Sequence, residues 1–167
     1  MKTRKTALIL LALTGTVLAT LLTLNCVMQF AVTQGSSMSP TILDGEVLIV
    51  RKLGDIRDGD MIAFYSDRYH MVLIKRVIAL EGETVRIQDG KVYRNGVMLI
   101  EKYLPSGCYT SGSETEITVQ PGEVYVMGDN RPVSQDSRSS GVGTVAREEI
   151  VGAVILRIWP FERFQLF

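Results

Sequence analysis

The N-terminal segment constrains the architecture of this chain more than any other stretch. Basic residues stand at positions 2, 4 and 5, an apolar run covers residues 6–30, and the next charged residue is Asp44. A hydrocarbon core about 30 Å thick requires about 20 helical residues, so this run is long enough to span a bilayer. Because the flanking positive charges lie only on the N-terminal side, we expect a cytoplasmic segment 1–5, a transmembrane helix 6–30 and an extracytoplasmic domain 31–167.

The apolar segment is also compatible with two kinds of export signal. A cleaved signal peptide has a basic start too, but its apolar region usually spans about 7–15 residues and ends at an A-x-A-like site, which this sequence lacks. A lipoprotein anchor at Cys26 would place Asn25 where a small residue is expected. We therefore favour an uncleaved anchor, which keeps the residues that follow close to the outer membrane face.

The composition excludes several classes of function. The 167 residues include 18 Lys+Arg and 18 Asp+Glu, so the net charge is zero and gives no electrostatic footprint for nucleic acid. Two cysteines, Cys26 and Cys108, and one histidine, His70, provide neither a disulfide framework nor a zinc cluster. We expect no cofactor, no metal and no nucleic-acid partner.

After the apolar segment, short apolar runs alternate with turns centred on glycine. Asp89-Gly90 and Asn95-Gly96 are strong hairpin signals, and this part of the chain shows almost no helical periodicity. The pattern predicts a mainly β domain, a folded antiparallel sheet or partial barrel. Residues 103–117 lack clear alternation, and we interpret them as a loose surface excursion. The expected strands are 46–52, 60–65, 71–80, 83–88, 91–94, 123–127 and 150–159.

A candidate nucleophile follows directly after the apolar segment. The stretch Gly35–Thr41 contains three serines, of which we favour Ser37. A serine hydroxyl attacks poorly unless a neighbouring base takes its proton. The single histidine, His70, lies at the polar edge of an expected strand, where a histidine is usually solvated surface.

Lys75 is the second candidate base, in the middle of the apolar run 71–80. In a strand it shares its face with Leu73 and Val77. Burial among such neighbours lowers the pKa of a lysine from about 10.4, and the neutral amine can then act as a general base. The alternative is an edge lysine that extends to water or blocks aggregation between strands.

A third segment changes the weight of these alternatives. Residues 128–138 are rich in turn formers and, taken alone, fit a solvated polar loop. Together with Ser37 and Lys75, however, they resemble the type I signal peptidases, membrane-bound Ser-Lys proteases that remove signal peptides from exported proteins. The likeness covers nearly the whole chain, with its blocks in the same order after an anchor. The similar blocks are Gly35–Thr41, Ile74–Ile78, Gly128–Arg138 and the closing Arg157–Phe161.

The resemblance implies a role for each matching residue. Ser37 would be the nucleophile, Lys75 the general base, and Ser134 a hydroxyl that hydrogen-bonds and orients the lysine. An oxyanion hole would form around the backbone of Gly35 and Ser37, where some relatives add a serine hydroxyl at position 35. Two supporting ion pairs are also implied, namely Arg76 with Asp129 and Asp136 with Arg138.

The resemblance also implies the substrate. Signal peptides of exported preproteins would bind as an added strand between the segment before Ser37 and the strand of Lys75, next to membrane lipid. The residues implied in contact with the substrate are Gln34, Met38, Leu73 and Ile74. Small residues at positions −1 and −3 of the substrate are the family's preference.

Some positions depart from the family pattern. Pro132-Val133 replaces an Asp-Asn pair, and Ser139-Ser140 replaces a bulkier pair. These changes leave open whether the clients are general or restricted. A second hypothesis is a catalytically silent, membrane-anchored assembly protein on the same fold, although such members lose the serine or the lysine that this chain keeps.

Overall fold

The computed structural model of the protein describes Leu11, residues 13–20 and residues 26–167. Leu11 and residues 13–20 are helical and exposed. The expected cytoplasmic segment 1–5 and much of the expected span 6–30 lie outside the described residues. Within the described part of the chain, no helix is both long and apolar enough to cross a bilayer.

The expected N-terminal helix does not reach Phe30. Strand β1, Met28–Val32, pairs antiparallel with β2, Val47–Arg51, so the prediction of helix is wrong for residues 28–30. An apolar run is compatible with helix or strand, and here the backbone hydrogen bonds to β2 decide between them.

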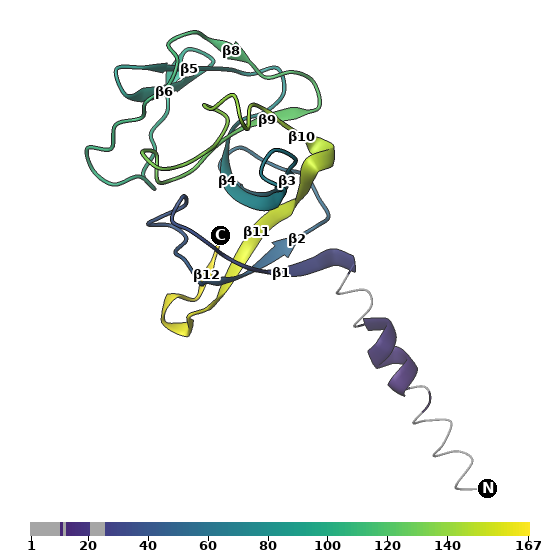
Figure 1. The fold of residues 1–167 in the computed structure, drawn as a ribbon. Helices are drawn as coiled ribbons and strands as arrows, with labels where there is room; N and C mark the ends of the chain where they lie inside the picture. Colours follow the sequence, from purple (N-terminus) through teal and green to yellow (C-terminus); the bar gives the residue numbers. More distant parts are fainter. Residues whose placement is uncertain (1–10, 12, 21–25) are drawn as a thin grey trace, which may run out of the picture.

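The domain is built from two antiparallel sheets (Figure 1). The larger sheet has eight strands in the order β1-β2-β11-β3-β4-β9-β10, and β12 pairs with β11. The smaller sheet has the order β7-β6-β5-β8. The remaining elements are β3 Met61–Ser66, β4 Met71–Ala79, β5 Thr84–Gln88, β6 Lys91–Arg94, β7 Val97–Met98, β8 Ile117–Thr118, β9 Glu123–Met127, β10 Val145–Ala146, the 3-10 helix η1 Arg147–Glu149, β11 Ile150–Trp159, the 3-10 helix η2 Phe161–Arg163 and β12 Gln165–Leu166.

The seven strands expected from the sequence all form, each within one residue of its expected bounds. Asp89 and Asn95 adopt φ of 49° and 51°, and the glycines after them also have positive φ, as tight hairpin turns require. The strands not expected are β1 and four pieces of two residues, which are too short to carry a pattern. The mainly β, antiparallel fold is confirmed.

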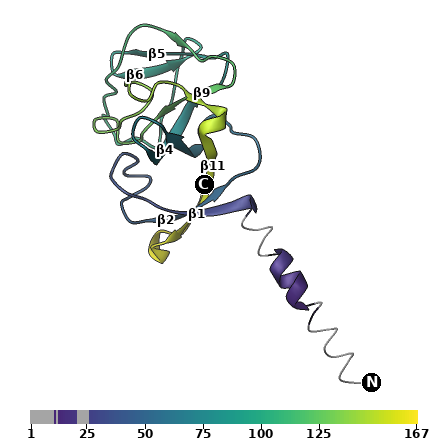
Figure 2. The same cartoon turned by 45° about the vertical axis from the view of Figure 1, so that its right-hand side comes forward.

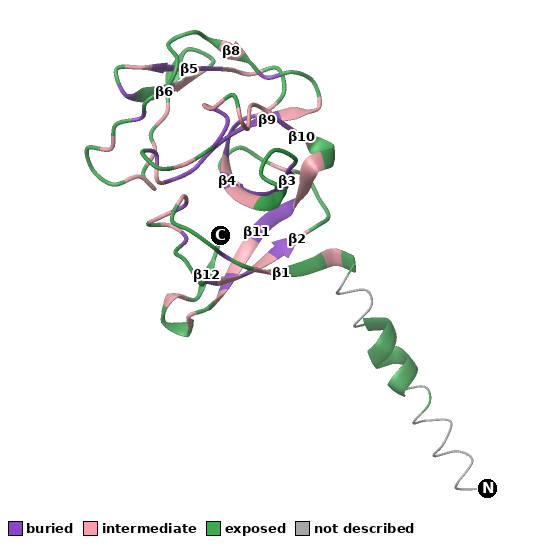
Figure 3. Ribbon diagram, in the orientation of Figure 1, coloured by how far each residue is buried: buried purple, intermediate pink, exposed green. Residues whose placement is uncertain are grey.

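The hydrophobic core falls into clusters of buried residues, and buried residues are purple in Figure 3. One cluster joins Val85 and Ile87 of the small sheet to buried residues of β4 and β9 in the larger sheet. Another lies under the larger sheet and contains Leu48 and Met61 together with Met38, which belongs to the turn after Ser37. Figures 1 and 2 show β5 and β6 at the end of the domain remote from β1, so the small sheet stands apart from the N-terminal strand.

Candidate active site

The turn that carries Ser37 is fixed on both sides. Before it, Gly35 adopts φ +87°, which favours glycine, and its N–H donates to Asp44 Oδ1 over 2.7 Å. After it, Met38 and Ile42 are buried in the core, and Ile42 N donates to Met38 O over 3.0 Å. Burying each of these side chains contributes roughly 1.5–3 kcal/mol, so the turn is held by the core of the domain.

Strand β4 brings Lys75 to this turn. Lys75 pairs with Ile62 of β3 and is only 2% exposed. Its Nζ lies 2.9 Å from Ser37 Oγ and donates to Ile74 O, also over 2.9 Å. The two residues predicted from the sequence as nucleophile and base are thus in hydrogen-bond contact, although 38 residues separate them in the chain.

The surroundings of Lys75 disfavour its charged form. Burial lowers the pKa of Lys75 from 10.5 to about 8, against a smaller opposing effect of the Asp136 carboxylate. No carboxylate among the described residues forms an ion pair with Nζ. A neutral amine beside a serine hydroxyl is therefore accessible near neutral pH.

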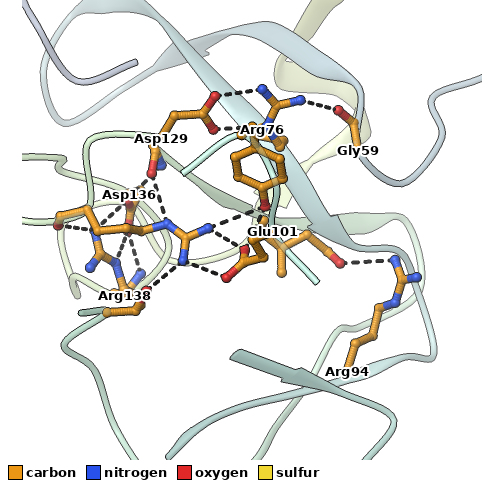
Figure 4. Close-up of polar contacts among 12 residues, drawn as sticks. Gly59, Arg76, Arg94, Glu101, Asp129, Asp136 and Arg138 are labelled. Carbon is orange, nitrogen blue, oxygen red and sulfur yellow. Dashed lines mark hydrogen bonds and ion pairs between the residues drawn. The ribbon is translucent and has the colours of Figure 1, made fainter. Parts of the chain in front are cut away.

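The expected ion pair of Arg76 with Asp129 is present (Figure 4). Arg76 Nε donates to Asp129 Oδ1 over 2.9 Å and Nη2 to Oδ2 over 2.6 Å, while Nη1 donates to Gly59 O. Asp129 Oδ2 also accepts a hydrogen bond from Thr41 Oγ1 over 2.5 Å. Through Asp129, Arg76 of β4 is thus linked to Thr41, in the turn that carries Ser37.

The expected pair of Asp136 with Arg138 is present too. Arg138 donates from Nε and Nη2 to the two carboxylate oxygens of Asp136, both over 2.8 Å. Asp136 Oδ2 also accepts the Gly128 N–H over 2.9 Å. Asp136 thus joins the two ends of the loop 128–138 and is itself buried, although other residues of the loop are exposed.

Ser134 does not make the hydrogen bond to Lys75 that the resemblance implied. Its Oγ is buried and has no hydrogen-bond partner among the described residues. A Cβ placed on Gly128 would lie 2.1 Å from Ser134 Oγ and 2.5 Å from Ser37 O, so Ser134 borders the site. The amine of Lys75 instead contacts Ser37 and the Ile74 carbonyl.

The backbone donors expected at Gly35 and Ser37 differ. The Gly35 N–H is taken by Asp44, so its expected part in an oxyanion hole is not supported. The Ser37 N–H has no acceptor among the described residues and remains free to donate. One backbone donor beside the nucleophile is therefore available.

A groove of about 280 Å³ runs past Ser37 and Lys75. One wall is formed by residues 29–35 and the other by residues 71–75 of β4. The strand β9 pairs with β4 only from Arg76 onward, so within the described chain the first half of β4 keeps one free edge. The four residues implied in contact with substrate, Gln34, Met38, Leu73 and Ile74, all line this groove.

Sequence reasoning missed partners of the loop 128–138. Arg131 is fully buried and donates hydrogen bonds to Glu101 and Thr110. These bonds attach the surface excursion 103–117 to the loop, at a residue just before it and at one in its middle. The absent side chain of Gly128 leaves the space that admits Ser134, which the motif alone does not reveal. Glu101, which follows the apolar run 97–100, likewise gives no sequence signal of a buried arginine partner.

The other residues discussed in the sequence analysis do not line the groove beside Ser37 and Lys75. His70 is exposed in the turn before β4 and does not line the groove. Cys26 and Cys108 are both free, as expected. The departures Pro132 and Val133 are exposed.

Comparison with known proteins places this geometry in a family. The model of the family described as "Signal peptidase, peptidase S26" matches residues 5–159. A signal peptidase I of Bacillus amyloliquefaciens is 38% identical over 140 residues, which cover 77% of this chain and 72% of that protein. Signal peptidase I T of Bacillus subtilis is 35% identical over 144 residues, covering 79% and 74%.

A solved structure agrees with the sequence relatives. The signal peptidase I of Enterococcus faecalis V583 matches with a TM-score of 0.52 and 32% identity, over 60% of this chain and 97% of that one. The resemblance drawn from the four sequence blocks is thereby confirmed. With its antiparallel fold, its family match over most of its length and these relatives, the chain belongs to the signal peptidase family, peptidase S26.

Proposed function

We propose that this protein is an endopeptidase that removes N-terminal signal peptides from exported preproteins, with Ser37 as nucleophile and Lys75 as general base. The observation that carries the proposal is the 2.9 Å contact of Lys75 Nζ with Ser37 Oγ at a lysine that is only 2% exposed. Family membership and the names of the relatives support the substrate class.

The chemistry follows from the two side chains. Neutral Lys75 takes the proton of the Ser37 hydroxyl as Oγ attacks the scissile carbonyl carbon, and the Ser37 N–H donates to the developing oxyanion. The ammonium then gives the proton to the leaving amine, and the C–N bond breaks to leave an acyl ester on Ser37. Water, deprotonated by Lys75, hydrolyses the ester and restores the serine.

The groove suits an extended peptide. The free edge at residues 71–75 offers backbone donors and acceptors to a strand, and alternate side chains of that strand would face Met38 and Ile74. Small residues at positions −1 and −3 would fit closest to the dyad. The proposed topology is a cytoplasmic segment 1–5 and a single span within residues 6–30, which holds the groove at the outer face next to membrane lipid.

The test is cleavage of a panel of exported precursors in detergent micelles by wild type and by Ser37→Ala, with each cut site mapped. Wild type should cut at the end of the signal peptide after small −1 and −3 residues, and Ser37→Ala should not cut. Ser36→Ala is the matched control, because Ser36 is exposed and its hydroxyl makes no bond among the described residues. Full activity of Ser37→Ala would refute the mechanism, and a folded wild type that cuts no precursor would favour the silent assembly protein instead.

A further inference from the structure

The C-terminal segment returns to the turn that carries Ser37. The 3-10 helix η2, Phe161–Arg163, follows β11 and directs Arg163 toward this turn. Arg163 Nη2 donates to Pro40 O over 3.0 Å and to Thr41 O over 3.4 Å. These carbonyls belong to the third and fourth residues after Ser37.

A buried carboxylate and a second arginine hold Arg163 in place. Arg163 Nη1 lies 3.1 Å from Glu46 Oε1, as an ion pair without hydrogen-bond alignment. Arg157 Nη1 donates to the other oxygen of Glu46 over 3.0 Å and to Thr41 O over 2.7 Å, and its Nε donates to Arg163 O. Glu46 is 1% exposed, so breaking the cluster would leave a charge without compensation in the interior.

The opposite side of the same turn is held by the base strand. Thr41 Oγ1 donates to Asp129, which is paired with Arg76, the residue after Lys75. The Thr41 carbonyl thus accepts hydrogen bonds from Arg157 and Arg163, and the Thr41 hydroxyl donates one to the Asp129 carboxylate. The turn that carries Ser37 is thus held by hydrogen bonds on two sides.

We propose that Arg163 is a positioning residue that acts through the carbonyls of Pro40 and Thr41 to keep Ser37 Oγ in reach of Lys75. The inference rests on the proposed function for its catalytic consequence. A small displacement of a reacting group can lower a rate by up to about 10²-fold, so a loss of this attachment is measurable in kcat.

The first measurement is kcat and KM for one precursor in detergent micelles with wild type and Arg163→Ala. We expect kcat to fall about tenfold with KM within a factor of two, because the groove at residues 29–35 and 71–75 is untouched. Arg163→Lys, which keeps the charge, should recover part of the loss. Arg147→Ala is the matched control, since Arg147 lies in the other 3-10 helix, is exposed and makes no side-chain bond among the described residues.

The second measurement is chemical rescue. Arg163 is 31% exposed in its side chain, so added methylguanidinium can reach the space left in Arg163→Ala. It should restore part of kcat at concentrations well below those that unfold the protein, and it should leave Arg147→Ala unchanged. An unchanged kcat in Arg163→Ala, or a loss confined to KM, would overturn the proposal.

The third measurement does not need activity. Hydrogen exchange at the amides of Ser39 and Ile42, which close the turn onto Ser36 O and Met38 O, should be faster in Arg163→Ala than in wild type. If wild type cleaves nothing, the proposed function fails but this comparison still decides whether Arg163 braces the turn. Equal exchange in the two proteins would refute the bracing.

Discussion

Charged groups are handled differently in the two sheets. Around the nucleophile the ion pairs are buried, as in Arg76 with Asp129, whose side chains are 11% and 0% exposed. In the small sheet Arg94 pairs with Asp58, which is 54% exposed, above a cluster of buried hydrophobic residues. One buried polar atom of this sheet, Arg86 Nε, has no hydrogen-bond partner among the described residues. The ion pair of the small sheet is thus partly exposed, whereas the larger sheet, which carries the candidate active site (the active-site sheet), places charges inside and pairs them.

Lys75 is the exception within the active-site sheet. Its neighbour Arg76 has a bidentate carboxylate, but Lys75 contacts only a hydroxyl and a carbonyl. An unpaired buried amine costs stability and becomes a base, because burial favours its neutral form. The contrast supports the proposal that the paired charges hold the site and that the unpaired Lys75 acts as the base.

The largest expected effect tests that unpaired amine. Lys75→Met should lower kcat by about 10³-fold, because no other base among the described residues contacts Ser37 Oγ, and should leave the free energy of unfolding unchanged or raised. Activity on a precursor and thermal unfolding measure the two. A marked loss of stability would mean that Lys75 is structural, like the paired charges around it.

The next effect tests the paired charges. Asp129→Ala should lower the free energy of unfolding by about 3–5 kcal/mol, because it leaves the buried charge of Arg76 without its carboxylate partner. Asp58→Ala, at the exposed pair, should cost less than about 1 kcal/mol. Urea unfolding of both variants measures the difference. Equal losses of unfolding free energy would show that the buried and the exposed ion pair contribute alike to stability.

The apolar core of the small sheet should affect stability alone. Ile87→Ala should cost about 3 kcal/mol through lost burial and the cavity left behind, with kcat of the folded protein unchanged. Val97→Ala, at a residue 68% exposed, is the control and should be nearly neutral. A fall in kcat per folded molecule would show that the small sheet also sets the geometry of the site.

The last prediction concerns the dependence on pH. Because the neutral amine is the active form and burial lowers the pKa of Lys75 to about 8, kcat/KM should rise about tenfold per unit below that pH and level off above it. The folded pKa lies below the unfolded value of 10.5, so the unfolded chain binds the extra proton between these values. The free energy of unfolding should therefore rise with pH from about 8 to 10.5, at up to about 1.4 kcal/mol per unit.

Lys75→Met separates the two contributions to this dependence. The variant has no amine to titrate at this position, so its unfolding free energy should lack the rise seen in wild type. A wild-type kcat/KM that is flat between pH 6 and 8 would contradict a lysine base.

Local sequence patterns were enough to predict the longer strands and to propose Ser37 and Lys75 as a catalytic pair. Two-residue periodicity and the Asp-Gly and Asn-Gly turns are local signals, so seven strands were predicted within one residue of their bounds. Ser37 and Lys75 were predicted because their blocks and the segment 128–138 stand in the order of a known family, whereas the pattern around Lys75 alone also fits an edge lysine; the Arg76–Asp129 pair was implied by the same resemblance. The sequence did not separate helix from strand at Met28–Phe30, where an apolar run fits either.

The contacts that hold the site together are visible only in the folded structure. The cluster of Glu46, Arg157 and Arg163 on the nucleophile turn joins residues more than 100 positions apart, and so does not appear in any local pattern. No local pattern reveals that Glu101 pairs with Arg131, or that the buried Ser134 hydroxyl has no hydrogen-bond partner among the described residues. Local spacing specifies which side chains share a strand face. The pairing of buried charges depends on how the sheet folds over itself, because the partners come from distant parts of the chain.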